Sequence, residues 1–314
     1  MRLFIYIIFL IMCAQPCVGQ LFPGKGDNID YLVTSGKDAG LKIGDDDHQQ
    51  TIFFLVPTRN DAPVYVRIFD PGFNQQVDEI NGTMNSETSY QLYGGAGCLS
   101  DSASRSVRSN QKHSGVFIDE KTFGSDPTWT KKWYSFGPIN PKKGEFNPIF
   151  GGYVFKLVID GIEGDDVNLY KVALSTSPET NIPLPGGNLF TYEYSFRLKS
   201  KGGSLAHVYP YMDQDIVSIK QFNFDSDNDV QLSFYSVVKK GDKAPASANG
   251  VWANSMHQIR KEEKKKCLDL QLKKRASWHN DMVMYILNQY GEAVPFFAAP
   301  IGDIRPKFSF ERVK

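Results

Sequence analysis

Residues 190–199 read Phe-Thr-Tyr-Glu-Tyr-Ser-Phe-Arg-Leu-Lys, with an aromatic or apolar side chain at every second position. Successive side chains of a β-strand point to opposite faces, so this alternation predicts a half-buried strand. Shorter apolar runs predict further strands at residues 51–56, 64–69, 153–159, 168–174, 282–287 and 293–297, with a hairpin turn at 288–292 between the last two. No long segment carries apolar residues at helical spacing. The chain is therefore predicted to be all-β.

A stretch rich in Pro and Gly, residues 178–188, predicts a rigid joint between two antiparallel β-sandwich domains of jelly-roll type. The chain of 314 residues is long enough for two such domains. The expected organisation is a signal peptide at 1–19, a lead segment at 20–48, a first sandwich at 49–177, the linker at 178–188 and a second sandwich at 189–314.

The two halves share a pattern of strand, acidic turn, strand and Pro-containing stretch. In the first half these are residues 156–159, 165–166, 169–174 and 182–184, and in the second half 268–272, 280–281, 283–287 and 294–296. We match the strands that open the halves as 64–70 and 206–213. Either the halves arose by tandem duplication, or they share only the succession of strand, turn and strand that all β-sandwiches have.

The first 19 residues have the form of an export signal. Arg2 is followed by the apolar run 3–12, and small residues precede Gln20. The run is too short to span a bilayer, and no other stretch approaches ~20 apolar residues, so we expect no transmembrane segment. The predicted location is the periplasm or the extracellular space.

Cleavage after residue 19 would leave two cysteines, Cys98 and Cys267. An exported protein can form disulfides, so one interpretation is a Cys98–Cys267 bond that joins the two halves. The other is two separate thiols. Cysteines so far apart, without paired histidines at metal-ligand spacing, make a zinc site unfavourable.

Charge is balanced, with 35 Lys and Arg against 35 Asp and Glu, which argues against a nucleic-acid binder that relies on a basic surface. Residues 260–275 are rich in Lys and Arg, and we interpret them as a charged hairpin or sheet edge. The alternative for this run is a contact with an anionic partner. A polar, serine-rich stretch at 100–114 predicts an exposed excursion.

The familiar catalytic motifs of hydrolases and metalloproteases are missing from the sequence: it has no H-E-x-x-H, no G-x-S-x-G and no C-x-x-C. The favoured class is therefore a non-catalytic binding or structural protein. A carbohydrate-active enzyme is the alternative, because Asp70 with Asp78 or Glu79 could form the carboxylate pair of a glycosidase.

Acidic clusters point to calcium, because calcium takes six to eight oxygen ligands from such loops. The predicted ligands of a first site are Asp45, Asp46, Asp47, Asp70, Asp78 and Glu79. A second candidate site is Asp225, Asp227 and Asp229, whose alternate spacing allows the carboxylates to converge. The alternative for both is solvated turn residues that cap backbone groups.

Aromatic residues provide a candidate contact surface at Trp129, Trp133 and Tyr134, just before a Gly-Pro-Ile-Asn-Pro stretch. Exposed Trp and Tyr can stack on sugar rings or anchor a protein partner. The alternative is that these rings close one end of a sandwich core.

Several stretches together resemble an uncharacterised family of exported β-sandwich proteins from gliding and surface-associated Gram-negative bacteria. They are residues 44–48 (GDDDH), 66–71 (VRIFDP), 93–95 (YGG), 133–138 (WYSFGP) and 164–170 (GDDVNLY). The resemblance implies export and a β fold, and it transfers no catalytic residue. We expect a calcium-stabilised protein of the cell envelope that binds another envelope protein or a glycan, or that plugs or supports an outer-membrane secretion or motility assembly.

Overall fold

The computed structural model describes residues 20–40, 48–107 and 112–304. The all-β prediction is confirmed, because two antiparallel sheets make up almost all of the regular structure. Helical structure in the described ranges is limited to the four-residue helix α1 (Ser102–Arg105) and three 3₁₀ turns: η2 (Pro127–Trp129), η3 (Pro141–Lys143) and η4 (Lys261–Glu263).

The first sheet has nine strands and spans both halves of the chain. Its spatial order is β17 (Trp252–Gln258), β14 (Ser218–Phe224), β20 (Asn280–Asn288), β12 (Glu193–Leu198), β2 (Ile29–Ser35), β10 (Val167–Ser175), β4 (Val64–Phe69) and β7 (Trp133–Ile139), with β1 (Leu21–Phe22) beside β10.

The second sheet has twelve strands and also spans both halves. Its order is β16 (Lys240–Ala244), β15 (Val230–Tyr235), β19 (Asp269–Lys274), β13 (Leu205–Met212), β21 (Phe296–Phe297), β11 (Asn188–Thr191), β3 (Gln49–Pro57), β9 (Gly152–Glu163), β5 (Glu87–Gly94) and β6 (Val116–Phe123). Two short strands flank it: β8 (Glu145–Asn147) pairs with β9, and β18 (Lys266–Cys267) pairs with β13.

The same strand order occurs twice. The first half contributes β2-β10-β4-β7 and β3-β9-β5-β6, and the second half contributes β12-β20-β14-β17 and β13-β19-β15-β16. Each set is an eight-stranded jelly roll. The repeat supports tandem duplication, with β9 matching β19 and β10 matching β20 as predicted. The predicted match of 64–70 with 206–213 is wrong, because the counterpart of β4 is β14 and β13 corresponds to β3.

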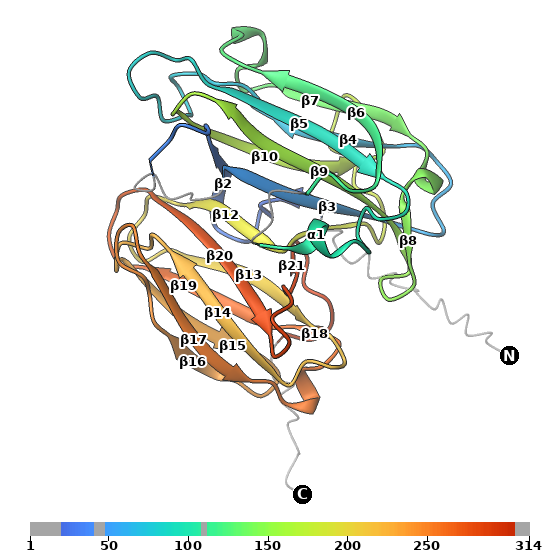
Figure 1. The fold of residues 1–314 in the computed structure, drawn as a ribbon. Coiled ribbons are helices and arrows are strands. Elements are labelled where there is room, and N and C mark those ends of the chain that lie inside the picture. Colours follow the sequence, from blue (N-terminus) through green and yellow to red (C-terminus); the bar gives the residue numbers. More distant parts are fainter. Residues whose placement is uncertain (1–19, 41–47, 108–111, 305–314) are drawn as a thin grey trace, which may run out of the picture.

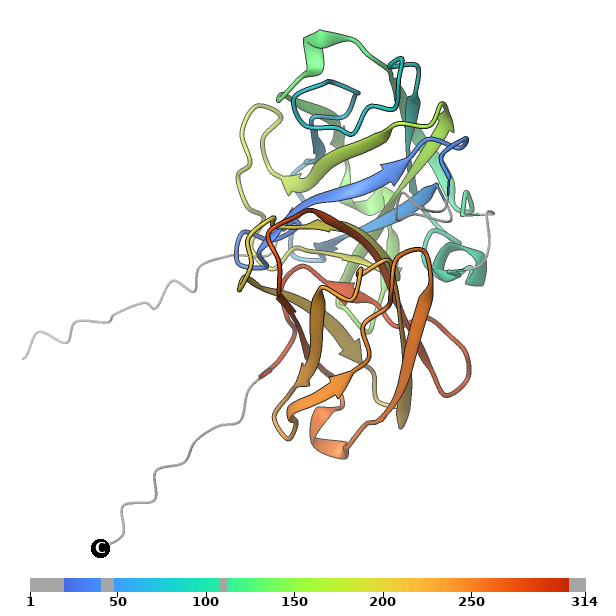
Figure 2. The ribbon, with the colours of Figure 1, turned by 90° about the vertical axis from the view of Figure 1, so that its left-hand side faces the viewer.

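The halves meet edge to edge in both sheets. In the nine-stranded sheet β2 pairs antiparallel with β12, and in the other sheet β3 pairs antiparallel with β11, which also pairs with β21. In each sheet the matched strands follow one another in the same order from either end, and the central pair is antiparallel. An approximate two-fold rotation therefore relates the halves. Figures 1 and 2 show the two lobes, blue to green and yellow to red, joined at this waist.

The core between the sheets is continuous through both halves. One cluster contains Ile52 and Phe54 of β3 together with Leu232 and Phe234 of β15. The predicted linker is part of this packing, since Leu184 is buried in the same cluster. Residues 178–188 therefore connect the halves without separating their cores, which corrects the expected joint between independent domains.

Three local predictions need correction. The lead segment 20–48 contains β2, which lies at the centre of the nine-stranded sheet. The single strand predicted at 190–199 is two strands, β11 and β12, and the chain crosses from one sheet to the other at Tyr192. The basic run 260–275 contains β19, which pairs with β13 and β15 on its two sides and is no edge.

The two strands predicted around the turn 288–292 are only partly paired. The turn itself forms, with a bridge between Leu287 and Ala293, and Asn288 Oδ1 accepts hydrogen bonds from the backbone N–H of Tyr290 and Glu292. Beyond it the chain departs to form β21, which pairs with β11 and β13 instead of β20. Among the described residues, no helix has the length and apolar character needed to cross a membrane.

Candidate functional site

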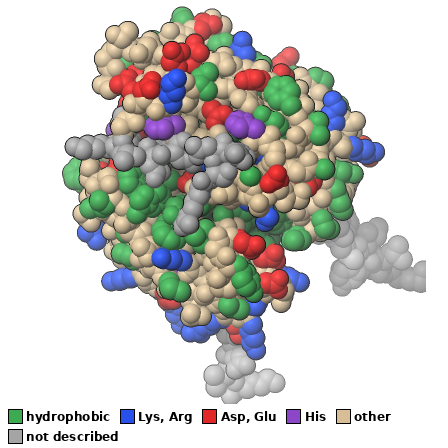
Figure 3. Space-filling model, in the orientation of Figure 1, with side chains coloured by type: hydrophobic (Ala, Val, Ile, Leu, Met, Phe, Trp, Pro, Cys, Tyr) green, Lys and Arg blue, Asp and Glu red, His purple; other side chains and the backbone are tan. Residues whose placement is uncertain are grey.

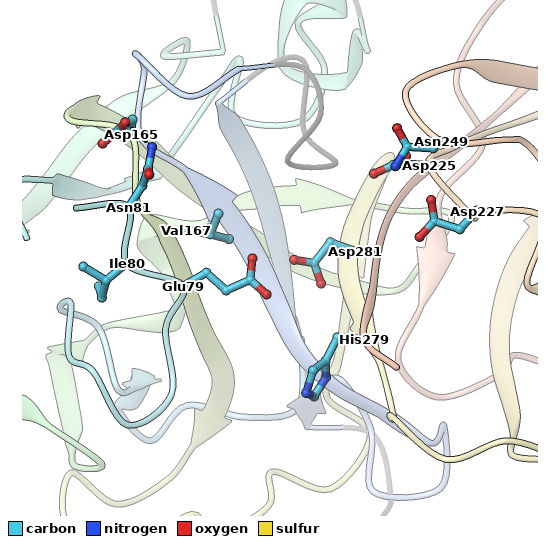
Figure 4. Close-up of a pocket in the computed structure, with 10 residues that line it drawn as sticks. All are labelled: Glu79, Ile80, Asn81, Asp165, Val167, Asp225, Asp227, Asn249, His279 and Asp281. Atoms are coloured by element: carbon cyan, nitrogen blue, oxygen red, sulfur yellow. Dashed lines mark hydrogen bonds between the residues drawn. The ribbon is translucent and has the colours of Figure 1, made fainter. Parts of the chain in front are cut away.

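An acidic pocket of about 320 Å³ lies on the nine-stranded sheet, where the two halves meet. Figure 4 shows Glu79 and Asp281 pointing toward one another from the two halves, with His279 nearby. The remaining carboxylates of its lining are Asp165, Asp225 and Asp227. The structure thus brings together Glu79 and two members of the Asp225 cluster, which the sequence placed in separate candidate sites.

A buried arginine neutralises part of this pocket. Arg197 on β12 donates from Nε to Asp281 Oδ1 at 2.6 Å and from Nη2 to Glu79 Oε1 at 2.6 Å. Burial alone would lower the pKa of Arg197, but the hydrogen bonds and negative charges of Asp281 and Glu79 raise it. The arrangement is an ion-pair triad that links the 70–86 loop of the first half to β12 and β20 of the second.

Asp70 and Asp78 hold the 70–86 loop in place. Asn74 Nδ2 donates to Asp70 Oδ1 at 2.9 Å and to Asp78 Oδ2 at 3.1 Å, while Asp78 Oδ1 accepts from the backbone N–H of Leu169 at 2.7 Å. Burial raises the pKa of Asp78 to about 8, against the opposing effect of its hydrogen bonds. N–H donors thus contact both carboxylate oxygens of Asp78 and Oδ1 of Asp70, whereas Asp70 Oδ2 is buried without a hydrogen-bond partner.

Asp225 and Asp229 of the second candidate site also contact other groups of the protein, and each has a different partner. Asp225 Oδ1 accepts from the backbone N–H of Gly250 at 2.6 Å, and Asp229 pairs with the buried Lys274 at 2.8 Å. Across the described ranges no group of three or more His, Cys, Asp or Glu side chains is arranged to hold a metal ion. The described members of the two predicted calcium sites are therefore not gathered into such a group, and Asp45, Asp46 and Asp47 lie outside the described residues.

The predicted aromatic contact surface is mostly internal packing. The rings of Trp129 and Tyr134 are 5.3 Å apart, and both pack against the main core. Trp133 lies against Phe69, with the Arg67 guanidinium 5.0 Å from its ring. These residues close one side of the first jelly roll, which was the alternative interpretation.

Cys98 and Cys267 are free, so the predicted disulfide is not formed. Cys98 follows β5, where its Sγ lies 3.7 Å from the Tyr93 carbonyl, while Cys267 is in β18 and its Sγ accepts from the backbone N–H of Ile301. Burial raises the pKa of each thiol to about 12. Both cysteines are therefore small buried residues with little thiolate character.

A second and larger cavity, which we call the aromatic cleft, lies on the outer face of the twelve-stranded sheet and has a volume of about 480 Å³. Its buried aromatic lining is Tyr192 and Tyr211, which pack with residues of β3 and β11. Phe54 of β3 points into the core, whereas Phe53 joins an outer cluster with Phe190, Tyr192 and Tyr211. Figure 1 shows α1 and β21 near this junction at the waist.

Two ordered turns form the walls of the aromatic cleft. In the first half, Asn147 Oδ1 accepts from the backbone N–H of Phe150, which shapes the turn after Phe146. In the second half, the Asn288-centred turn described above carries Tyr290 at its tip. Phe146 is 55% exposed and Tyr290 is 72% exposed, so both rings are available to a ligand.

Polar side chains complete the lining of the aromatic cleft: Arg105, Glu145, Asn147, Asp213, Asp215, Asn288 and Glu292. The face of the molecule in Figure 3 shows a similar mixture, with acidic and basic side chains interspersed and apolar ones between them. Aromatic faces next to carboxylates and amides can bind a molecule that has both apolar and hydroxyl-bearing surfaces.

The sequence did not single out the residues of the aromatic cleft. A tyrosine beside Gly291 in a predicted turn, and the run Phe-Asn-Pro-Ile-Phe at 146–150, were the available signals of exposed aromatic rings. Arg105 lies in the serine-rich segment that we expected to be an exposed excursion, but Ser104 is buried against the sheet.

No family model matches the chain, and no curated protein matches its sequence. Among solved structures, one similar chain is the N-terminal CBM22-1–CBM22-2 tandem domain of Xyn10C from Paenibacillus barcinonensis. It has 8% identity and a TM-score of 0.16 over 88% of this chain and 86% of that one. Another is the structure of the infectious bursal disease virus Gx strain, with 8% identity and a TM-score of 0.15 over 85% and 74% of the two chains. TM-scores this low carry no argument about fold or function.

Proposed function

We propose that the protein is a non-catalytic carbohydrate-binding protein of the cell envelope, and that its ligand lies in the aromatic cleft. The observation that carries the proposal is the pair of exposed rings, Phe146 from the first half and Tyr290 from the second, that line one cleft together with Tyr192 and Tyr211. Export follows from the predicted signal peptide at residues 1–19.

A sugar ring is the ligand chemistry that fits this lining. One face of a pyranose presents C–H groups that pack on an aromatic ring, and its edge carries hydroxyls that need acceptors and donors. Asn147 and Asn288, whose side chains already shape the walls, lie beside the exposed rings together with Asp213 and Asp215. A purely apolar ligand would leave these polar groups without partners, at a cost in free energy.

The acidic pocket supports binding in preference to glycoside hydrolysis. A glycosidase needs one carboxyl group that is protonated and positioned to act as an acid. The Arg197 guanidinium donates to both carboxylate oxygens of Asp281 and to Glu79 Oε1, so these oxygens face the arginine and not a substrate. We therefore assign this pocket a structural role, as the ion-pair link between the halves.

The test is a glycan array probed with the purified protein, followed by calorimetry on the best ligand. Tyr290→Ala and Phe146→Ala should each weaken binding by about fivefold, because stacking on an aromatic ring contributes of order 1 kcal/mol. Trp278→Ala is the matched control, since Trp278 is 54% exposed but lies outside the lining of the aromatic cleft.

Two outcomes would reject the proposal. One is the absence of binding to any glycan at millimolar concentration. The other is equal loss of affinity in the Trp278→Ala control, which would place the sugar elsewhere on the surface. Hydrolysis of a bound oligosaccharide, lost in Glu79→Gln, would instead support the carbohydrate-active enzyme.

A further inference from the structure

Arg105 is shared by two neighbouring cavities. It is the last residue of α1 and lines the aromatic cleft together with Glu292 and Ala293. The same three residues also line an adjoining cavity of about 390 Å³, which continues past α1. Arg105 therefore lies where a ligand in the aromatic cleft would extend into the second cavity.

No carboxylate of the described chain pairs with Arg105. Its Nε is buried without an acceptor, and its side chain hydrogen-bonds to Tyr192 in the cleft lining. Two carboxylates that share the cleft have other partners: Glu145 Oε2 accepts from the backbone N–H of Leu99 and Ser100, and Glu292 Oε2 accepts from Asn288 Nδ2 at 3.0 Å.

The backbone that carries Arg105 is firmly anchored. Asp101 caps α1 by accepting from the backbone N–H of Ala103, and the buried Lys156 ammonium donates to Ser104 Oγ at 2.6 Å and to the Ser114 carbonyl at 2.7 Å. A cation held on an anchored segment loses little conformational freedom when an anion binds.

We propose that Arg105 binds the carboxylate of an acidic sugar, so that the ligand of the aromatic cleft carries a uronic or sialic acid unit next to neutral units. This inference rests on the carbohydrate-binding function proposed above. A guanidinium matches a carboxylate with two parallel hydrogen bonds. Asp213, Asp215 and Glu292 elsewhere in the cleft disfavour a polyanion, which limits the ligand to a single negative charge at the Arg105 position.

The experiment compares matched glycans with and without the acidic unit, such as sialyllactose against lactose and glucuronic-acid-substituted xylo-oligosaccharides against unsubstituted ones. We expect at least one acidic member to bind tenfold or more tightly than its neutral partner. Arg105→Gln should remove this difference, so that the acidic and neutral members bind about equally. Arg275→Gln, an arginine outside the cleft, should change neither affinity.

The outcomes separate the two proposals. If neutral glycans bind as well as acidic ones, or if Arg105→Gln keeps the preference, the assignment of Arg105 fails and the carbohydrate-binding function stands. If no member of either class binds, both fail. Circular dichroism and the unfolding temperature of Arg105→Gln establish that any loss of binding occurs in a folded protein. Should that variant not fold, Arg105→Lys, which keeps the charge but not the two-pronged geometry, must lose most of the preference for the acidic member.

Discussion

Asp70 and Asp225 occupy the same position in the two jelly rolls. Each directly follows the third strand of its half, β4 or β14, and each has a left-handed backbone, with φ of 55° and 56°. Aspartate tolerates this conformation better than most residues. Asp70 accepts hydrogen bonds from Asn74 Nδ2 and the backbone N–H of Lys131, whereas Asp225 accepts one from Gly250.

This pair provides a matched comparison of stability. Asp70→Ala and Asp225→Ala impose similar backbone strain, so the difference between them reports the unequal hydrogen bonding. We expect Asp70→Ala to lower the free energy of unfolding by ~1 kcal/mol more than Asp225→Ala does. Urea denaturation followed by tryptophan fluorescence measures both. Equal losses would mean that backbone conformation dominates at these positions.

Arg197 should be among the most sensitive residues in the chain. Replacing it with Met leaves the buried Asp281 carboxylate without its cation, and such changes cost ~3–5 kcal/mol. The exposed pair Lys142–Asp61 is the control, since its loss in Lys142→Met should cost less than ~1 kcal/mol. Equilibrium unfolding at neutral pH distinguishes the two magnitudes. A small effect of Arg197→Met would show that Asp281 tolerates protonation without cost.

Asp27 should make stability depend on pH. Burial raises its pKa to about 7, with the Asp269 charge adding to the effect and His207 and the Gly24 N–H opposing it. Since the folded pKa lies above the unfolded value of 3.8, folding favours the protonated form, and stability is lost as pH rises between these values. Relative to Asp27→Asn, the wild-type chain should lose at most ~1.4 kcal/mol per pH unit over this range.

Denaturation curves at several pH values between 4 and 8 measure this difference. Asp61→Asn, at an exposed position, is the control and should run parallel to the wild type. Parallel curves for Asp27→Asn as well would contradict the assigned shift.

The two described cysteines should be unreactive in the folded protein. Their thiols are buried and their raised pKa leaves almost no thiolate at neutral pH. Iodoacetamide should label Cys98 and Cys267 only after unfolding, as read by peptide mass spectrometry. A reducing agent should leave the unfolding temperature unchanged, and a drop on reduction would indicate that the two residues do pair.

Calcium can be tested by thermal unfolding with chelator or with millimolar calcium. Asp70, Asp78, Asp225 and Asp229 each accept hydrogen bonds from N–H groups or from Lys274, and no three of the described carboxylates converge, so we expect no shift from them. A shift that disappears when Asp45, Asp46 and Asp47 are changed to Asn would locate a site at those residues. A shift that survives this change would contradict the assignment of the described carboxylates.

Alternating side chains made the fold class predictable, since β4 matches its predicted bounds and β3, β9, β10 and β20 contain the predicted runs. The central place of β2 was missed, because its neighbours β10 and β12 are far away in sequence. Residues 190–199 keep strict alternation while the chain changes sheets at Tyr192, because alternation records which side chains are buried and not which strand they pair with. The repeated strand pattern in the sequence matched β9 with β19 and β10 with β20, but the counterpart of β4 follows from the strand order in the sheets alone.

The site was less predictable than the fold. Acidic clusters were visible as sequence runs, but whether a carboxylate faces a cation, a backbone N–H or a distant arginine depends on packing. Glu79 meets Arg197 across 118 positions of sequence. The aromatic cleft combines residues from five separated segments, each of which is an ordinary loop or strand end on its own.

The edge-to-edge pairing of the halves has a consequence for how the chain can be divided. A cut within residues 178–188 would leave β2 and β3 of one fragment, and β12 and β11 of the other, with rows of unpaired backbone groups. Open edges of this kind recruit other strands and lead to aggregation. Each jelly roll covers strand edges of the other. We therefore expect either half alone to aggregate, whereas the joined pair does not expose these edges.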